Sequence, residues 1–190
     1  MSNSILIKDN FFDSVDELSE LAHSADYMYH LNTPISVVWR GYRTWELSYL
    51  NNPIISKFYQ EVLESSSEYF NLKEDHSMEM YFHMSYEKDN KSQLRKWHKD
   101  NTSFAGLIYL TPDAPVTAGT TVFVDGEQIN VENKYNRLIV YSGSLKHGPT
   151  GYFGETLQDV RRTLVFFMDL KDEMDKHCEF MNKMRLKYNS

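Results

Sequence analysis

Four short apolar segments in the second half of the chain alternate with turn-forming residues. Residues 104–110 (FAGLIYL), 120–124 (TTVFV), 137–141 (RLIVY) and 161–168 (RRTLVFFM) are rich in β-branched and aromatic side chains, which favour strands. Glycine and proline separate these segments, at Pro112, Pro115, Gly119, Gly126, Gly143, Gly148 and Gly151. The pattern predicts an antiparallel jelly-roll sandwich, a class of all-β architecture with a mouth that can hold a metal.

The flanks of this region have helical periodicity instead. Ser14 and Glu17 have the spacing of a capping box, and Asn52-Pro53 provides an N-cap and a first-turn proline for a second helix. A third helix is predicted over 172–187, with methionines that we expect to fill the core. At 190 residues the chain has the length of one domain. We divide it into mainly helical support (1–75), a jelly-roll core (76–170) and a C-terminal helix (171–190), which makes the expected fold class α+β.

A His-x-Asp triplet, formed by His98 and Asp100, lies just before the first apolar segment. On a strand, residues two apart point their side chains to the same face, and His147 can add a third ligand from a neighbouring strand. Two histidines and one carboxylate are typical of non-haem Fe(II) sites, because they leave several metal positions open. The similar triplet at 177–179 falls in the predicted C-terminal helix, where residues two apart face different sides, so we expect no metal there.

With these residues in this order, the chain resembles the Fe(II)- and 2-oxoglutarate-dependent dioxygenases, most closely their prolyl-4-hydroxylase-like branch. The resemblance covers about residues 78–169. It rests on these motifs in chain order: Tyr86, His98-Lys99-Asp100-Asn101, Leu107-Ile108-Tyr109-Leu110, Gly119-Thr120-Thr121-Val122-Phe123, Asn136-Arg137-Leu138-Ile139-Val140-Tyr141 and Arg161-Arg162-Thr163. One departure is the interval of fourteen residues from His147 to Arg161, which is longer than the family's pattern and contains three glycines that suggest an enlarged turn.

The resemblance implies a double-stranded β-helix (jelly-roll, cupin-like) fold and a set of cofactors. Fe(II) would be held by three residues: His98, Asp100 and His147. The distal carboxylate of 2-oxoglutarate would be bound by three others: Arg161, Thr163 and Tyr109. O2 would be the co-substrate and ascorbate the reductant, with succinate and CO2 as products.

Two adjacent arginines compete for the co-substrate carboxylate. Strand alternation puts Arg161 and Thr163 on one face and Arg162 on the other. Only Arg161 shares its face with a hydroxyl group, so we assign it the carboxylate and keep Arg162 as the alternative. Trp97 and Asn101 flank the metal ligands, and either support them or are plain packing residues.

The substrate is less constrained by the sequence. A net charge of −7 and a pI near 5.5 argue against a nucleic acid, because such binding requires neutralisation of phosphates. We expect hydroxylation of a protein or peptide side chain, with proline the first candidate. The alternatives are hydroxylation of a free amino acid or other small molecule, and a non-catalytic jelly roll that binds a metal or a partner. The candidate substrate contacts are a basic loop at 87–96 and an aromatic, arginine-bearing segment at 38–47 (VWRGYRTWEL).

No feature of the sequence points to a membrane or to secretion. The chain contains no apolar run long enough for a transmembrane helix, and its N-terminus lacks the pattern of a signal peptide. Cys178 is the only cysteine, which excludes an intrachain disulfide and fits a reducing compartment. We therefore expect a cytoplasmic protein.

Overall fold

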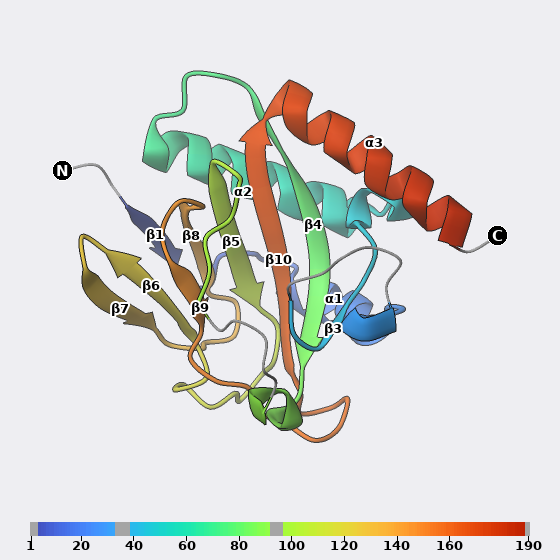
Figure 1. Cartoon of the computed structure of the whole chain (residues 1–190), viewed down its shortest axis with the longest axis vertical. Coiled ribbons are helices and arrows are strands. Elements are labelled where there is room, and N and C mark those ends of the chain that lie inside the picture. Colours follow the sequence, from blue (N-terminus) through green and yellow to red (C-terminus); the bar gives the residue numbers. More distant parts are fainter. Residues whose placement is uncertain (1–3, 33–38, 92–96, 189–190) are drawn as a thin grey trace.

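A seven-stranded antiparallel sheet is the largest element of the computed structural model, which describes residues 4–32, 39–91 and 97–188. Its strand order is β1-β8-β5-β10-β4-β3-β2 (Figure 1). The strands are β1 (Ile5–Lys8), β2 (Met28–Tyr29), β3 (Tyr42–Arg43), β4 (His76–Ser85), β5 (Phe104–Tyr109), β8 (Leu138–Ser142) and β10 (Arg161–Leu170). The long strands β4 and β10 pair over ten residues, from Arg161↔Ser85 to Leu170↔His76, and form the centre of the sheet.

A smaller sheet in the order β7-β6-β9 packs on one face of this sheet, through side chains of β5 and β8. Its strands are β6 (Thr120–Val124), β7 (Glu127–Val131) and β9 (His147–Pro149). Val122 of β6 lies against Ala105 and Tyr141 of the large sheet. The two sheets form the sandwich that the apolar segments predict.

Helices α1 (Val15–His23) and α2 (Pro53–Phe70) cover the other face of the large sheet. Alternation along β10 separates the two faces. Leu164, Phe166 and Met168 pack in the core beneath α1 and α2, whereas Val165 and Phe167 point into a cavity on the side of the small sheet. One strand thus supplies both the main hydrophobic core and the wall of a site.

Helix α3 (Lys171–Tyr188) follows β10 directly and packs on the cavity side of β4. Met181 lies against Tyr81 of β4, next to Val165 and Phe167. Met174 and Met181 are buried, which confirms that methionines of this helix fill core space. None of the helices in the described ranges is long and apolar enough to cross a membrane.

All four apolar segments form strands, with boundaries within two residues of the prediction. The prediction for residues 1–75 is less complete, because this part also contributes β1, β2 and β3 to the large sheet. β1 has four residues and the other two have two each, too few to show a periodicity. They are strands because the edges of β8 and β4 offer backbone partners.

The two N-terminal helices begin where their caps predict, but only one cap works as expected. The Asn52 carboxamide accepts hydrogen bonds from the backbone N–H groups of Ile54 at 2.8 Å and Ile55 at 3.4 Å, with Pro53 in the first turn. Ser14 precedes α1, yet its side chain makes no capping hydrogen bond. The predicted capping box is therefore not formed at this helix.

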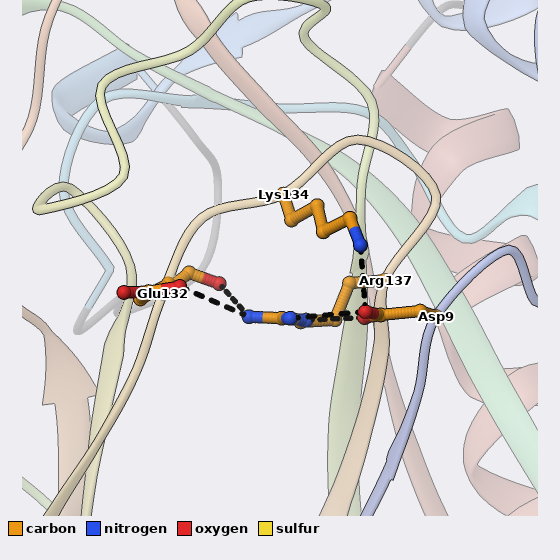
Figure 2. Close-up of polar contacts among 4 residues, drawn as sticks. All are labelled: Asp9, Glu132, Lys134 and Arg137. Atoms are coloured by element: carbon orange, nitrogen blue, oxygen red, sulfur yellow. Dashed lines mark hydrogen bonds and ion pairs between the residues drawn. The ribbon is translucent and has the colours of Figure 1, made fainter.

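An ion-pair network joins the end of β1 to the loop that enters β8 (Figure 2). The Asp9 carboxylate accepts from Arg137 Nε at 2.6 Å and from Lys134 Nζ at 2.7 Å. On its other side Arg137 lies 3.9 Å from Glu132. These hydrogen bonds, from Arg137 first and then Lys134, hold the pKa of Asp9 well below its ordinary value.

Asp9→Asn is expected to lower the free energy of unfolding by about 1 kcal/mol at pH 7, a typical value for a networked surface ion pair. Because the folded-state pKa is depressed, the stabilisation is complete above the unfolded pKa of about 4 and is lost as the pH falls through the folded value. The stability difference between wild type and variant in urea unfolding should therefore shrink from pH 7 to pH 3. Asp13→Asn, at an exposed aspartate without an ion pair among the described residues, is the control. Equal stability of wild type and Asp9→Asn at pH 7 would contradict this prediction.

Candidate metal centre

His98 and His147 lie opposite each other at one edge of the small sheet. Their backbones exchange two hydrogen bonds, with N···O distances of 3.0 and 2.8 Å. The Asp100 N–H donates to the carbonyl oxygen of Gly143 at 2.9 Å. The expected strand at 98–100 is thus a single bridge followed by an irregular turn, and it is the backbone pairing with His147 that orients the triplet.

The three predicted ligands come together in space. Asp100 Oδ1 lies 3.6 Å from His98 Nε2, and Asp100 Oδ2 lies 3.2 Å from His147 Nε2. Potential ligand atoms of all three lie within 4.8 Å of one another, and no other such group occurs in the part of the chain that is described. Two ligands placed about 2.1 Å from a metal at right angles are about 3.0 Å apart, so the carboxylate and each imidazole are near that spacing.

Hydrogen bonding leaves His147 ready to bind a cation. Its Nδ1 lies 2.9 Å from the carbonyl oxygen of Leu145, and since a carbonyl only accepts, Nδ1 carries the proton. In the neutral ring, Nε2 then carries a lone pair directed at Asp100 Oδ2, a buried oxygen without a hydrogen-bond partner among the described residues. Two facing acceptors are stable only with a proton or a cation between them. The donor set of two imidazoles and one carboxylate fits Fe(II).

A cavity of about 130 Å³ extends from these ligands between the two sheets. Ala105, Leu107 and Val165 form an apolar part of its wall, and Thr120 and Arg161 supply polar groups. Arg161 contacts the backbone at Ala118 and Gly119, whereas His147 pairs with Val122. Gly119 and Val122 are three residues apart on the chain, so Arg161 and the ligand cluster are separated by about 10 Å along β6.

The two adjacent arginines point in opposite directions. Arg161 lines the cavity and donates from Nε to Ala118 O at 3.2 Å and from a terminal nitrogen to Gly119 O at 3.4 Å. Arg162 instead contacts His23 of α1, at 3.2 Å, and the carbonyl oxygen of Leu157. Of the two, only Arg161 reaches the space beside the predicted metal ligands.

Tyr109 and Thr163 lie deeper in the wall than expected. Both are fully buried and neither contributes to the cavity surface. The Tyr109 hydroxyl donates to Thr120 Oγ1 at 2.8 Å, and the Thr163 hydroxyl has no partner in the described part of the chain. Thr120, in the glycine-led strand segment, therefore lines the cavity in their place, and sequence reasoning did not single it out.

Other cavity residues were missed or only suggested by the sequence. Trp39 and Arg43 come from the aromatic segment that we expected on the substrate side, and Tyr152 comes from the long turn before β10. That turn has Gly154 at φ +83°, a conformation that favours glycine. His83 of β4 also lines the cavity, and burial, with the charge of Arg43, lowers its pKa to about 3, so the imidazole is neutral at neutral pH.

The remaining candidates lie away from the cavity. His177 of α3 pairs with Glu79 of β4 at 3.0 Å. Trp97 packs edge-on against Phe123, with ring centroids 5.5 Å apart, and Asn101 is exposed. Of the basic loop at 87–96, residues 92–96 lie outside the described ranges.

Comparison with known proteins identifies the fold. No family model and no curated protein sequence matches the chain. A prolyl-4-hydroxylase from Pseudomonas putida is similar in structure, with a TM-score of 0.66 and 14% identity over 90% of this chain and 94% of that one. HygX from Streptomyces hygroscopicus, with nickel, 2-oxoglutarate and hygromycin B bound, has a TM-score of 0.63 and 10% identity over 89% and 83%.

A third similar structure is an oxidoreductase of the 2OG-Fe(II) oxygenase family from Burkholderia pseudomallei, with a TM-score of 0.65 and 12% identity over 87% and 84%. The chain has a double-stranded β-helix fold. The resemblance inferred from the sequence is thus confirmed at the level of the fold. In this double-stranded β-helix, the candidate metal ligands lie at the edge of the small sheet and Arg161 on the large sheet.

Proposed function

We propose that the chain is a single-domain Fe(II)- and 2-oxoglutarate-dependent dioxygenase that hydroxylates a protein or peptide side chain, with proline the first candidate. The observation that carries the proposal is the pairing of two features in one cavity. One is the cluster of His98, Asp100 and His147, in which a buried carboxylate oxygen has no hydrogen-bond partner. The other is a buried arginine, Arg161, without a carboxylate partner among the described residues.

The distance between these features suits the co-substrate. About 10 Å along β6 is comparable with a five-carbon dicarboxylate plus one metal–oxygen bond and one hydrogen bond. Arg161 uses two of its five N–H donors on backbone carbonyls, which leaves others to bind the distal carboxylate in a planar fork. Thr120 and the Tyr109–Thr120 hydrogen bond support that end of the cavity.

When bound, Fe(II) with 2-oxoglutarate and O2 supplies the oxidising power for C–H hydroxylation, with ascorbate as reductant and succinate and CO2 as products. The protein's residues position and shield the reactants. Asp100 and the two histidines hold the metal on one side. The Leu145 carbonyl holds the His147 ring in the orientation that directs Nε2 to the metal position. Leu107 and Val165 contribute apolar surface to the cavity that the metal ligands and Arg161 also line.

Hydroxylation of a free amino acid or other small molecule is the alternative that a specific observation favours. The cavity of about 130 Å³ is below the usual 300–1,000 Å³ of sites for drug-sized ligands. We therefore expect the group that enters beside the co-substrate to be small, either a small molecule or a single side chain of a peptide.

The proposed function is tested by incubating the protein with 2-oxoglutarate, Fe(II) and ascorbate in air and measuring succinate. We expect succinate above a metal-free control, because enzymes of this chemistry turn over the co-substrate slowly without the prime substrate. A parallel anaerobic titration with Mn(II) should show 2-oxoglutarate binding that depends on the metal. Absence of both succinate and binding would overturn the proposal and favour a non-catalytic jelly roll.

A further inference from the structure

Arg43, at the end of β3, adds a cationic group to the cavity, which Arg40 and Arg161 also line. Its guanidinium carbon lies 4.5 Å from the centre of the Trp39 ring, 5.2 Å from that of Tyr81 and 5.7 Å from that of Phe167. Phe167 is two strands away from β3 in the large sheet, so the side chain extends along the cavity wall. Part of Arg43 remains accessible, and this part lines the cavity.

No carboxylate of the described residues pairs with Arg43. Of the two carboxylates that act on its pKa, Glu79 pairs with His177, and Asp100 lies 3.6 and 3.2 Å from the candidate metal-binding histidines. The residues outside the described ranges contain no Asp or Glu. Burial lowers the pKa of Arg43, which shows that its charge is poorly solvated in the absence of a partner.

Two buried hydrogen-bond donors in this part of the cavity have no acceptor. Arg43 Nε and Trp39 Nε1 are both inaccessible to solvent and without a partner among the described residues. Leaving a buried donor unpaired typically costs about 1–3 kcal/mol, and more when the group is charged. Stacking on aromatic rings stabilises a cation but does not satisfy N–H groups. The surroundings of Arg43 are therefore those of an anion-binding site.

In the proposed active site, the charges of the metal, the co-substrate and the residues that bind them cancel without Arg43. The two positive charges of Fe(II) and the one of Arg161 equal the one negative charge of Asp100 and the two of 2-oxoglutarate. The nearby His83 is neutral, because burial and the charge of Arg43 lower its pKa to about 3. The positive charges of Arg43 and of Arg40, which also lines the cavity, are not part of this balance, so the complex with metal and co-substrate leaves room for a further anion.

We propose that Arg43, with Trp39 Nε1, binds a carboxylate of the prime substrate, so that this dioxygenase acts on an acidic molecule or on a residue beside an acidic group. The inference rests on the proposed function, because it takes 2-oxoglutarate to be bound at Arg161. A planar carboxylate can accept two parallel N–H donors from the terminal nitrogens of the guanidinium, beside the indole N–H of Trp39, which has no acceptor among the described residues. Arg43 then has a specificity-determining role and positions the bond to be hydroxylated.

The test uses acetate as the probe and acetamide, which has the same shape without the charge, as its partner. The full chain is saturated with Mn(II) and 2-oxoglutarate without O2, so that Arg161 is occupied, and each probe is titrated at constant ionic strength. Binding is followed by tryptophan fluorescence, measured in parallel in a Trp45→Phe, Trp97→Phe background in which Trp39 is the only tryptophan. We expect acetate to bind at least about tenfold more tightly than acetamide, the effect of a charge-assisted hydrogen bond.

Arg43→Met should remove the preference for acetate, and Arg43→Lys should retain part of it. Arg185→Met is the matched control, because Arg185 also stacks on an aromatic ring, Tyr49 at 4.2 Å, but lies outside the cavity. The thermal stability of the free protein is a second measurement. Removal of an unpaired cation should leave the melting temperature of Arg43→Met unchanged or higher, whereas a purely structural Arg43 requires it to fall.

Equal binding of acetate and acetamide to wild type would overturn the inference, as would an acetate preference that survives in Arg43→Met. A fall in the melting temperature of that variant would also count against it. Failure of the proposed function has a different signature, because 2-oxoglutarate would then not bind in the first step. If 2-oxoglutarate binds and acetate has no advantage, only the role of Arg43 is wrong.

Discussion

Asp100→Ala is expected to abolish Fe(II)-dependent succinate formation, with a loss of more than about 100-fold. Even partners that only orient a metal ligand typically contribute 10–100-fold, and Asp100 is the one carboxylate of the cluster. Its oxygens lie 3.6 and 3.2 Å from the two imidazoles, so the variant loses both the negative charge and the central member of the set. His147→Ala should have a similar effect, measured as succinate released per enzyme.

The same variants should remain folded. Asp100 Oδ2 is buried without a hydrogen-bond partner, so in the metal-free protein its removal takes away a destabilising group. Wild type should gain thermal stability from Mn(II), and Asp100→Ala should not. Lys99→Ala is the matched control, because Lys99 lies between the two ligands and its side chain is exposed. Full succinate formation by Asp100→Ala would show that the cluster is not the metal site.

Arg161→Gln is expected to raise the KM for 2-oxoglutarate by about 10–100-fold, with a smaller effect on kcat. The loss of hydrogen bonds to a charged group typically costs about 1.5–3 kcal/mol, and each 1.4 kcal/mol is tenfold in affinity. Arg161 is buried in the cavity wall beside Ala118 and Gly119, and a glutamine carboxamide cannot replace its fork of N–H donors. Succinate formation as a function of 2-oxoglutarate concentration measures the effect.

Arg162→Gln is the comparison, since it removes the same side chain from the neighbouring position. Its guanidinium contacts His23 and the Leu157 carbonyl on the opposite face of β10. We therefore expect a loss of thermal stability with a KM near that of wild type. The reverse result, a high KM in Arg162→Gln and a normal one in Arg161→Gln, would show that Arg162 binds the co-substrate carboxylate.

The strands β5, β6, β8 and β10 were predictable because each is a short run of β-branched and aromatic residues bounded by turn-forming residues, whereas this pattern did not single out β4, β7 or β9. In β10, alternation alone separated Arg161 from Arg162, and the structure has them on opposite faces as expected. The short strands β1, β2 and β3 were not predicted, since runs of two to four residues have no periodicity of their own. Ser14 showed a further limit: its spacing to Glu17 fits a capping box, but its side chain makes no such bond.

The sequence predicted the positions of some residues of the candidate site better than those of others. His98, Asp100 and His147 were recognised by residue type and spacing, and the structure brings them together. Tyr109 was also recognised by position in its strand, yet its hydroxyl ends at Thr120 and does not line the cavity. Whether a side chain reaches the cavity depends on the distance between the two packed sheets, and no single segment of the sequence determines that distance.

The sequence by itself determined the sandwich class, the three candidate ligands and the face of β10 that carries Arg161, because these follow from local periodicity and donor chemistry. Only the tertiary structure decided the setting of Arg43, which sits between Trp39, Tyr81 and Phe167 from separate strands and segments. The same holds for the orientation of His147, held by the Leu145 carbonyl. An unpaired charge or an unsatisfied donor is a property of everything that surrounds a group, and those surroundings exist only once distant parts of the chain have packed together.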